Sequence, residues 1–410
     1  MLRASPRALP FVVAIAAIGI ALMPGHAVAA GFSVLHAFGG PGDGATPKAG
    51  LVSDKSGNLY GTTRLGGSQN EGTIFQIAPD GTETVLVEFT GQSDGAFPVA
   101  RLAIDTKGNL YGTTKFGGDL NCGKGKGCGV VFKLTPDNTL VGLHLFSGGS
   151  DGAFPVAEVA LDKKGNLLGT TMEGGGAGCG TAGCGIVFRL LQNGTYKILH
   201  AFAGGTDGAN PTSGIAVGGY GYFYGTASLG GSTGCGGNGC GTIFLVQNNG
   251  DEGALHVFKG GDDGAFPNGI LLSGKLDKLV GTTSAGGGTG CGGQGCGTVF
   301  TQQIPVGNES ILYAFAGGAD GSDPEGGIVV DGSGNLDGTT ASGGGAGCGG
   351  AGCGTLFKLT KQGAETVLYA FPGGSDGNTP LGPPAIVKKV LYGTASGGGD
   401  LGGGTVFQLK

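Results

Sequence analysis

The sequence of 410 residues contains no tryptophan, and charged residues make up only 13% of it. The absence of tryptophan excludes repeat motifs that are built around that side chain. The net charge of −6 provides no basic excess to neutralise phosphates, so no nucleic-acid partner is expected. The scarcity of charge, together with 39% hydrophobic residues, also argues against a disordered chain, because disordered chains combine high charge with little apolar surface.

Long apolar runs are also lacking after residues 1–30. Within those residues, two arginines precede an apolar run at positions 11–23, and Ala27-Val28-Ala29 follows it. This order is typical of a secretory signal peptide that is cleaved near Ala29 or Ala30. The alternative, an uncleaved membrane anchor, would need about 20 apolar residues. We therefore predict a secreted or periplasmic protein without a membrane span in the mature chain.

Glycine is abundant, at 98 positions, and much of it recurs with a period. The tetrad YGTT and its variants are spaced by 51, 57, 56, 56, 57 and 55 residues. They begin at Tyr60, Tyr111, Leu168, Tyr224, Val280, Asp337 and Tyr392. Each unit contains four short strand patterns, of the types AGLVSD, LYGTT, GTIFQI and TVLVEF, and several units have Asn-Gly or Asp-Gly hairpin turns between the last two. Four-strand meanders that repeat about every 56 residues are typical of propeller blades.

The two ends of the sequence each hold part of a unit. The last unit stops at its third strand pattern, GTVFQLK, and residues 32–38 (FSVLHAF) form a fourth pattern without the first three. A linear array would leave both parts as exposed sheet edges, which is unfavourable. We therefore predict an all-β, seven-bladed β-propeller with four-stranded antiparallel blades, closed by the N-terminal strand pairing with the last blade. Residues 31–410 would form this single domain, and the chain is expected to be a monomer.

Phenylalanine recurs at two positions of the unit, one in the third strand pattern and one at the end of the fourth. The first set is Phe75, Phe132, Phe188, Phe244, Phe300, Phe357 and Phe407. The second set is Phe38, Phe89, Phe146, Phe202, Phe258, Phe315 and Phe371. Because burying one phenylalanine stabilises a fold by about 1.5–3 kcal/mol, these two rings are predicted to form much of the core between blades.

All ten cysteines lie in one type of loop, between the second and third strand patterns. They form the pairs Cys122/Cys128, Cys179/Cys184, Cys235/Cys240, Cys291/Cys296 and Cys348/Cys353. The even number and the local pairing, in a chain with a predicted signal peptide, indicate five disulfides. They are expected to fasten glycine-rich loops that have no side chains to pack. The alternatives are zinc binding, which normally uses closer spacings and converging pairs, and a redox-active thiol, which typically uses the CxxC spacing. No metal or other cofactor is expected.

The unit GNLYGTTxxGG…GTVFxLxxxGxxxxLYAF resembles the repeat of the bacterial tandem-repeat family called GloVer, also described as choice-of-anchor repeats. The resemblance covers almost all of residues 32–410. It implies an exported bacterial protein and brings no established activity. Other propeller repeats, such as the WD, sialidase Asp-box and quinoprotein repeats, depend on tryptophan, which this sequence lacks.

Histidine and aspartate recur at fixed positions of the units, which favours an architectural role. The histidines two residues before the unit-ending phenylalanine are His36, His144, His200 and His256. An Asp-Gly pair follows in every unit, with the aspartates at Asp43, Asp94, Asp151, Asp207, Asp263, Asp320 and Asp376. Asp-Gly favours a turn that the aspartate side chain caps. The alternatives are a catalytic base for the histidines and calcium binding for the carboxylates.

Departures from the repeat provide the candidates for a binding site. Units one to three carry charged or bulky residues just after GTT, and units two and three carry a charged residue in the inner strand pattern. The candidates are Arg64, Arg101, Lys115, Phe116, Glu158 and Glu173. In a meander the loops at these positions lie on one face of the ring, so a charged cluster is predicted at one mouth of the central channel. The alternative is surface variation with an Arg101–Glu158 ion pair.

The sequence contains no catalytic motif, which favours binding as the function. The protein is predicted to be a secreted binding or cell-envelope interaction module for a glycan or protein ligand. The alternative is an extracellular polysaccharide-active enzyme, a hydrolase or lyase, with its site at the channel mouth. Such an enzyme would need two carboxylates, or a base and a neutralising group, close together. Glu158 and Glu173, with Arg101 or Lys115, are the candidates for that chemistry.

Overall fold

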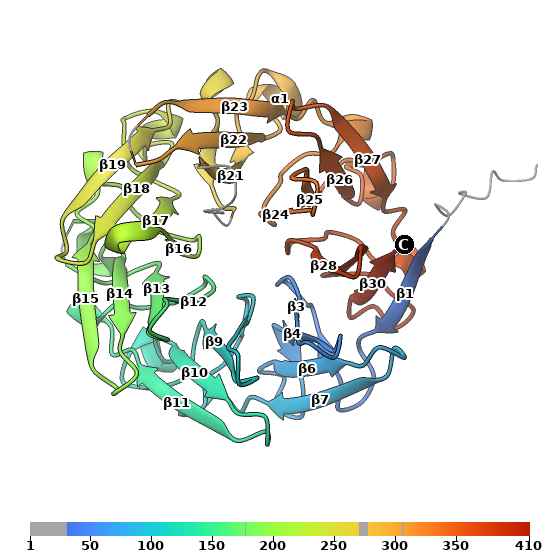
Figure 1. Cartoon of the computed structure of the whole chain (residues 1–410), viewed down its shortest axis with the longest axis horizontal. Coiled ribbons are helices and arrows are strands. Elements are labelled where there is room, and N and C mark those ends of the chain that lie inside the picture. Colours follow the sequence, from blue (N-terminus) through green and yellow to red (C-terminus); the bar gives the residue numbers. More distant parts are fainter. Residues whose placement is uncertain (1–30, 177, 270–277, 306) are drawn as a thin grey trace, which may run out of the picture.

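Seven four-stranded antiparallel sheets surround a common axis in the computed structural model, which describes residues 31–176, 178–269, 278–305 and 307–410 (Figure 1). The predicted all-β, seven-bladed propeller is therefore confirmed. The predicted signal peptide, residues 1–30, lies outside the described residues. Among the described residues, no helix combines the length and the apolar character that a membrane crossing requires.

The blades follow one another in chain order. In blades 1 to 4 and 6 the innermost strand comes first in the chain, whereas the first strand given for blade 5 lies in the connection from blade 4. Blade 1 consists of β3 (Val52–Ser53), β4 (Leu59–Thr63), β6 (Thr73–Ile77) and β7 (Glu83–Glu88). Blade 2 consists of β8 (Ala103–Ile104), β9 (Leu110–Thr114), β10 (Val130–Leu134) and β11 (Leu140–Leu145). Blade 3 consists of β12 (Ala160–Leu161), β13 (Leu167–Thr171), β14 (Ile186–Leu190) and β15 (Tyr196–Ala201). Blade 4 consists of β16 (Ala216–Val217), β17 (Tyr222–Ala227), β18 (Thr242–Gln247) and β19 (Glu252–Val257). Blade 5 consists of β20 (Ala265–Pro267), β21 (Lys278–Ala285), β22 (Thr298–Gln303) and β23 (Glu309–Ala314). Blade 6 consists of β24 (Ile328–Val330), β25 (Leu336–Thr340), β26 (Thr355–Leu359) and β27 (Glu365–Ala370).

Short elements occupy the connections. The strands β2 (Gly44–Ala45) and β5 (Leu65–Gly66) form a small separate sheet, and in blade 5 the corresponding segment is β20. The α-helix of the described residues, α1 (Gly290–Gly293), is a single turn. The 3-10 turns are Gly123–Gly125, Gly149–Asp151, Gly180–Ala182, Gly205–Asp207, Gly219–Gly221, Cys235–Gly237, Gly261–Asp263, Gly318–Asp320, Cys348–Gly350 and Gly374–Asp376.

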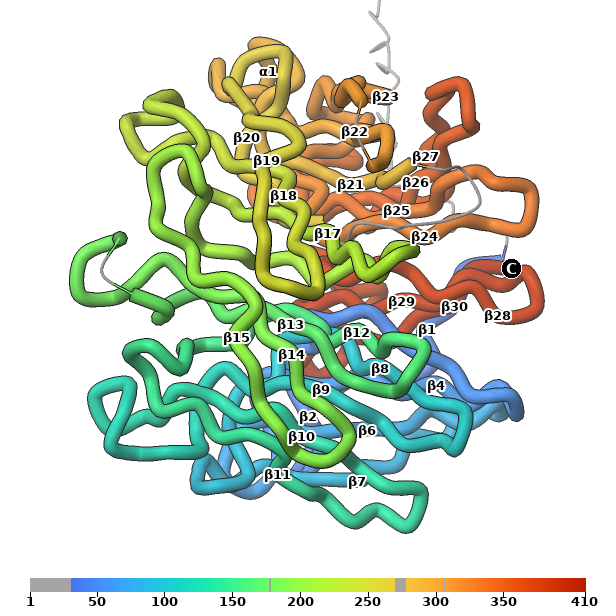
Figure 2. The backbone as a smooth tube through the Cα atoms, turned by 60° about the vertical axis from the view of Figure 1, so that its left-hand side comes forward, coloured from blue at the N-terminus to red at the C-terminus, as the bar shows by residue number. Residues whose placement is uncertain are grey.

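Blade 7 combines the two ends of the described chain. It consists of β28 (Ala385–Val387), β29 (Val390–Ala395), β30 (Thr405–Leu409) and, as its outermost strand, β1 (Phe32–Ala37). The pairing of β1 with β30 is antiparallel, from Phe32 opposite Leu409 to Ala37 opposite Thr405. Figures 1 and 2 show the blue first strand beside the red last blade. The predicted closure of the ring by the N-terminal strand is therefore confirmed.

The glycine of the YGTT motif makes room for a phenylalanine ring on the neighbouring strand. Gly61 lies opposite Phe75, Gly225 opposite Phe244, and the same register holds in the other blades. A Cβ atom on Gly225 would overlap the Cζ atom of Phe244. Glycine is thus required at this position by packing.

The two phenylalanine sets meet between blades. Phe38, which directly follows the outer strand of blade 7, contacts Phe75 of blade 1 with ring centroids 4.9 Å apart. The equivalent pairs at the other six interfaces have centroid distances of 5.1–5.5 Å. All fourteen rings are at most 2% exposed. They form the repeated apolar contact that holds one blade to the next.

The structure contains the five predicted disulfides, with Cα atoms 5.1–5.5 Å apart. Each joins two cysteines of the same loop, and the described residues contain no free cysteine. The predicted pairing within blades is therefore confirmed.

The cysteines differ from the expectation in one respect, because half of them belong to the core and not to a loop without packing. The second cysteine of every pair is at most 2% exposed: Cys128, Cys184, Cys240, Cys296 and Cys353. Each packs in the same apolar cluster as the phenylalanine that ends its unit. The expectation that these loops have no side chains to pack is wrong for these five residues, since the sulfur atoms themselves fill space beside the phenylalanine rings.

The backbone at the same five positions joins one blade to the next. The carbonyl oxygens of Cys128, Cys184, Cys240, Cys296 and Cys353 accept hydrogen bonds of 2.8–2.9 Å from backbone N–H groups of the following unit. The Phe266 N–H, for example, donates to the Cys240 carbonyl at 2.8 Å. In the units without cysteine the Glu71 and Gly403 carbonyls accept the equivalent bonds. The disulfides therefore fix a contact between blades as well as a loop.

Replacing both Cys235 and Cys240 by alanine is expected to lower the free energy of unfolding by about 2 kcal/mol or more, because the disulfide removes loop entropy from the unfolded chain and Cys240 is buried. Urea unfolding without reductant measures the difference, which should shrink when a reductant is present. Mass spectrometry of the exported wild-type chain should find five links within blades. Free thiols at most of these positions, or links between blades, would contradict this role of the cysteines.

Candidate functional site

The residues that follow the proline of each unit line one cavity of about 420 Å³ at one end of the ring. They are Lys48, Val99, Val156, Thr212, Asn268, Glu325 and Leu381, one from each of the seven units. In every unit the residue before the proline has a φ of 53–59°, in the left-handed region. We call the surface around this cavity the channel mouth.

Three of the six residues singled out by the sequence line the same cavity: Arg64, Lys115 and Phe116. Arg64 directly follows β4, and Lys115 directly follows β9. The Arg64 guanidinium carbon lies 5.2 Å from the centre of the Phe97 ring, and Lys115 Nζ lies 5.4 Å from the centre of the Phe116 ring. These cation–π contacts hold both cationic groups against aromatic faces.

A second cavity of about 300 Å³ adjoins the channel mouth and shares Phe116 with it. Its other lining residues include Glu71, Phe97 and Lys126. The Phe116 ring centroid lies 5.7 Å from that of Phe97 and 5.4 Å from that of Phe154, so three aromatic side chains lie together on this side of the mouth. Of these three, Phe116 lines the channel mouth and Phe97 lines the adjoining cavity.

The cationic side chains of the channel mouth lie close enough to repel one another. Burial, and then the positive charge of Arg64, lowers the pKa of Lys48, while Glu325 acts in the opposite direction. Glu325 is exposed, whereas Lys48, Arg64 and Lys115 are half-buried. Among the described residues, none of these three cations is part of an ion pair. The mouth thus presents uncompensated positive charge on the side of blades 1 and 2.

The other three predicted residues lie elsewhere. Arg101 Nη1 and Glu158 Oε2 are 4.0 Å apart, and the Arg101 Nε–H donates to the Leu51 carbonyl at 3.1 Å. Burial raises the pKa of Glu158, although the Arg101 charge opposes the shift. The Glu173 backbone pairs with Ala153 at hydrogen-bond distances of 2.8 and 3.0 Å. None of the three lines the described cavity at the channel mouth, and Arg101 with Glu158 forms the ion pair that was the alternative interpretation.

Sequence reasoning missed four polar residues of the mouth: Lys48, Thr212, Asn268 and Glu325. Each stands immediately after a proline that recurs in all seven units. The signal available in the sequence was that the residue after this proline differs between units, although the proline itself does not. Comparing that one position across the units would have identified the whole ring.

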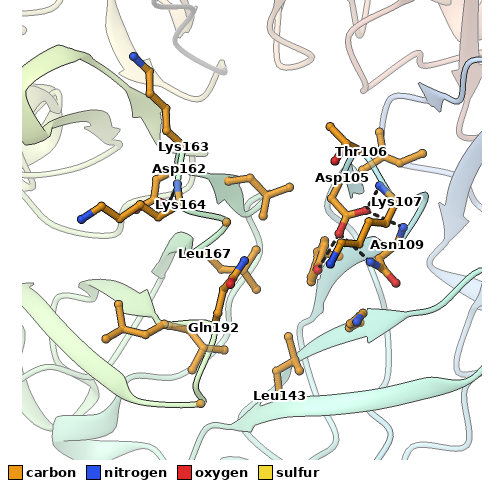
Figure 3. Close-up of a pocket in the computed structure, with 18 residues that line it drawn as sticks. Asp105, Thr106, Lys107, Asn109, Leu143, Asp162, Lys163, Lys164, Leu167 and Gln192 are labelled. Atoms are coloured by element: carbon orange, nitrogen blue, oxygen red, sulfur yellow. Dashed lines mark hydrogen bonds between the residues drawn. The ribbon is translucent and has the colours of Figure 1, made fainter.

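Another cavity, of about 670 Å³, lies between blades 2 and 3 at the opposite end of the ring (Figure 3). The Asp105 carboxylate in its lining accepts hydrogen bonds from the turn that follows it. Asp105 Oδ1 accepts the Lys107 and Asn109 backbone N–H groups at 2.8 and 2.9 Å, and its Oδ2 accepts the Asn109 amide and the Tyr111 hydroxyl at 2.7 and 3.1 Å. Lys164 points away from the facing wall in Figure 3. This cavity has more volume than the channel mouth, but its Asp105 carboxylate is engaged in the turn that it caps.

Three sets of side chains in the described residues could hold a metal ion, with ligand atoms within 4.8 Å of one another. They are His36, Asp43 and Glu83; His200, Asp207 and Glu252; and His256, Asp263 and Glu309. At the equivalent place in another interface, Tyr313 replaces histidine and donates its hydroxyl to Asp320 at 2.6 Å, with Glu365 nearby. Because the arrangement persists without a histidine ligand, it is best explained as a contact between blades.

The glutamates of these contacts titrate near neutrality. Burial raises the pKa of Glu252, Glu309 and Glu365 to about 7, and the neighbouring aspartates act in the same direction. A group whose pKa is higher in the folded chain stabilises folding at low pH, and this stabilisation is lost as the pH rises through the folded value. The free energy of unfolding should therefore contain a component that falls between about pH 4.5 and 7.

Replacing Glu252, Glu309 and Glu365 together by glutamine is expected to remove this component. Glutamine keeps a hydrogen-bond donor beside each aspartate, so the variant should equal the wild type near pH 4.5 and exceed it at pH 8. After allowance for solvent exposure, the gain should be about 1 kcal/mol per site. Unfolding titrations across this range measure the difference, with Glu325→Gln as an exposed control. A constant difference between wild type and triple variant at all pH values would contradict the assignment.

The matching family model is the Gloeobacter/Verrucomicrobia repeat, over residues 25–237 and 123–351. No curated protein matches the sequence. The extracellular domain of a candidate hybrid two-component system from B. thetaiotaomicron has a TM-score of 0.57 at 10% identity, over 92% of this chain and 39% of that one. A candidate 6-phosphogluconolactonase from Bacteroides uniformis has a TM-score of 0.51 at 15% identity, over 80% and 86%. At these identities the likeness shows the fold alone.

Proposed function

We propose that this chain, which belongs to the Gloeobacter/Verrucomicrobia repeat family, is a secreted binding module whose channel mouth holds a glycan. The five disulfides point to a location outside the cytoplasm, because such bonds persist in oxidising compartments. The signal peptide predicted for residues 1–30 agrees with export.

One observation supports the proposal most. The proline, the left-handed bend before it and the phenylalanine contacts recur around the ring, but the residue at the channel mouth changes from unit to unit. The seven positions include a cation, an anion, a hydroxyl, an amide and three aliphatic side chains. A scaffold that repeats while it presents different groups to one cavity is suited to recognising an asymmetric ligand.

The shape of the site favours a glycan over a protein surface. A cavity of about 420 Å³ lies in the range of small-ligand sites, about 300–1,000 Å³, whereas protein partners usually bind broad surfaces. The Phe116 ring, which lines both the channel mouth and the adjoining cavity, supplies apolar surface for a sugar ring. Among the described residues that line the mouth, Glu325 is the one carboxylate, and ordinary glycoside cleavage uses two. Binding is therefore favoured over hydrolysis.

A glycan array probed with the purified mature chain tests this function. We expect binding to a restricted set of glycans, and a loss of about tenfold or more in affinity for Phe116→Ala, because that ring lines both cavities. The control is Ser284→Ala, which changes the residue equivalent to Lys115 in blade 5, outside the described cavity wall. An array without signal, or equal losses from both variants, would refute a glycan site at the mouth.

A further inference from the structure

We infer that the ligand of the channel mouth is acidic, a sugar residue with a carboxylate that Lys48, Arg64 and Lys115 bind together. This inference rests on the proposed function and names the chemical class of the ligand.

Positive charge is concentrated at the channel mouth. The whole chain has a net charge of −6, yet three cations line one cavity of about 420 Å³ against a single acid, Glu325. The three cations come from blades 1 and 2 and are not part of any ion pair among the described residues. Like charges that lie close together in a partly buried place repel one another, which is unfavourable. A bound anion would reverse that cost.

The three cationic groups suit a carboxylate ligand. Arg64 offers a planar fork that can hold both oxygens of a carboxylate, while Lys48 and Lys115 act as point charges. The Phe97 ring beneath the Arg64 guanidinium restrains its plane, with 5.2 Å between the guanidinium carbon and the ring centre. The burial that lowers the pKa of Lys48 also means that water screens its charge poorly, so an anion there would be attracted strongly.

The opposite side of the mouth carries polar groups that suit hydroxyl groups of a ligand. The Thr212 hydroxyl donates to Asn268 Oδ1 at 2.9 Å, and the amide N–H groups of Asn268 are donors that can serve a ligand. Glu325, in the neighbouring blade, can accept from hydroxyl groups. A ligand that fits therefore carries a negative group at one end and hydroxyl groups at the other. An acidic sugar has both, whereas an inorganic anion has no hydroxyl-bearing end and a nucleic acid would need a wider basic surface.

Calorimetric titration of the mature chain with trigalacturonate and with neutral galactotriose tests the inference. Trigalacturonate is expected to bind about 10- to 100-fold more tightly, the range of one or two charge-assisted hydrogen bonds, and its affinity should fall as salt is added. Arg64→Gln and Lys115→Met should each remove most of that preference. Lys164→Met, which changes a lysine at the opposite end of the ring, should leave it intact. Unchanged melting temperatures would show that the variants fold.

Each other outcome has a distinct meaning. Equal affinity for both trisaccharides would overturn the acidic-ligand inference and leave the glycan function standing. Tight binding of phosphate alone, or of an acidic peptide but neither trisaccharide, would overturn the assignment of a sugar. A glycan array that stays blank, together with no heat from either trisaccharide, would refute the proposed function itself.

Discussion

Deleting residues 31–38 is expected to lower the melting temperature by about 10 °C or more, a far larger effect than trimming an ordinary terminus. The deletion removes β1, so β30 becomes an open sheet edge. It also removes Phe38, which is fully buried against Phe75, and Phe32, whose ring stacks on Tyr369 with centroids 3.8 Å apart. Loss of a single such phenylalanine commonly costs about 3–5 kcal/mol.

Differential scanning calorimetry measures this effect. The matched control is a chain that begins at Phe32, because it retains β1 and both phenylalanines. If the shortened chain without residues 31–38 melts at the wild-type temperature, then β1 does not close the ring in solution.

The second large effect concerns the pairing of glycine and phenylalanine across each blade. Phe244→Ala is expected to lower the free energy of unfolding by about 3–5 kcal/mol, because it leaves a cavity at an interface between blades. Gly225→Ala is expected to cost about 1–3 kcal/mol, because its new methyl group would meet the Phe244 ring. The two changes should not add. In the Phe244→Ala background, Gly225→Ala should cost little, since the ring that it would strike has gone.

A double-mutant cycle by urea unfolding measures this coupling. A useful control pairs Phe244→Ala with Gly338→Ala, whose clash is with Phe357 in another blade, and those two effects should add. Additive effects for Gly225 and Phe244 would mean that the glycine serves the backbone and not the ring.

Most of the architecture could be predicted because its causes are local and repeat. The incomplete strand patterns at residues 32–38 and 404–410 were sufficient to predict the closing pair β1 and β30. The cysteine pairs are separated by 5 or 6 positions, so their partners followed from proximity alone. The inner strand of blade 5, expected near residues 270–274, lies outside the described residues and stays a prediction.

The burial of one cysteine in each pair could not be predicted in the same way. Cys291 and Cys296 have similar glycine-rich surroundings in the sequence, yet Cys291 is exposed and Cys296 is 1% exposed. The difference arises because Cys296 stands two residues before β22, where the chain has already entered the blade and packs beside Phe315. This contact joins positions of the unit that only the folded blade brings together.

The candidate site was only partly predictable, for a physical reason. Thr46 and Phe97 adopt a positive φ, which neither residue type signals. The bend comes two residues before the side chain that lines the channel mouth, so the importance of the position after each proline was hidden. Charge alone was a poor guide: Arg101 and Glu158 face each other, while Glu325, overlooked in the sequence, lines the cavity.

The channel mouth as the binding site, with the repeated blades as its scaffold, is tested most directly by a crystal structure of the mature chain with bound trigalacturonate. We predict ligand density at the mouth, with a carboxylate within hydrogen-bond distance of Arg64 and Lys115 and a sugar ring beside Phe116. Density in the cavity between blades 2 and 3, or on the outer strands, would contradict the proposed site.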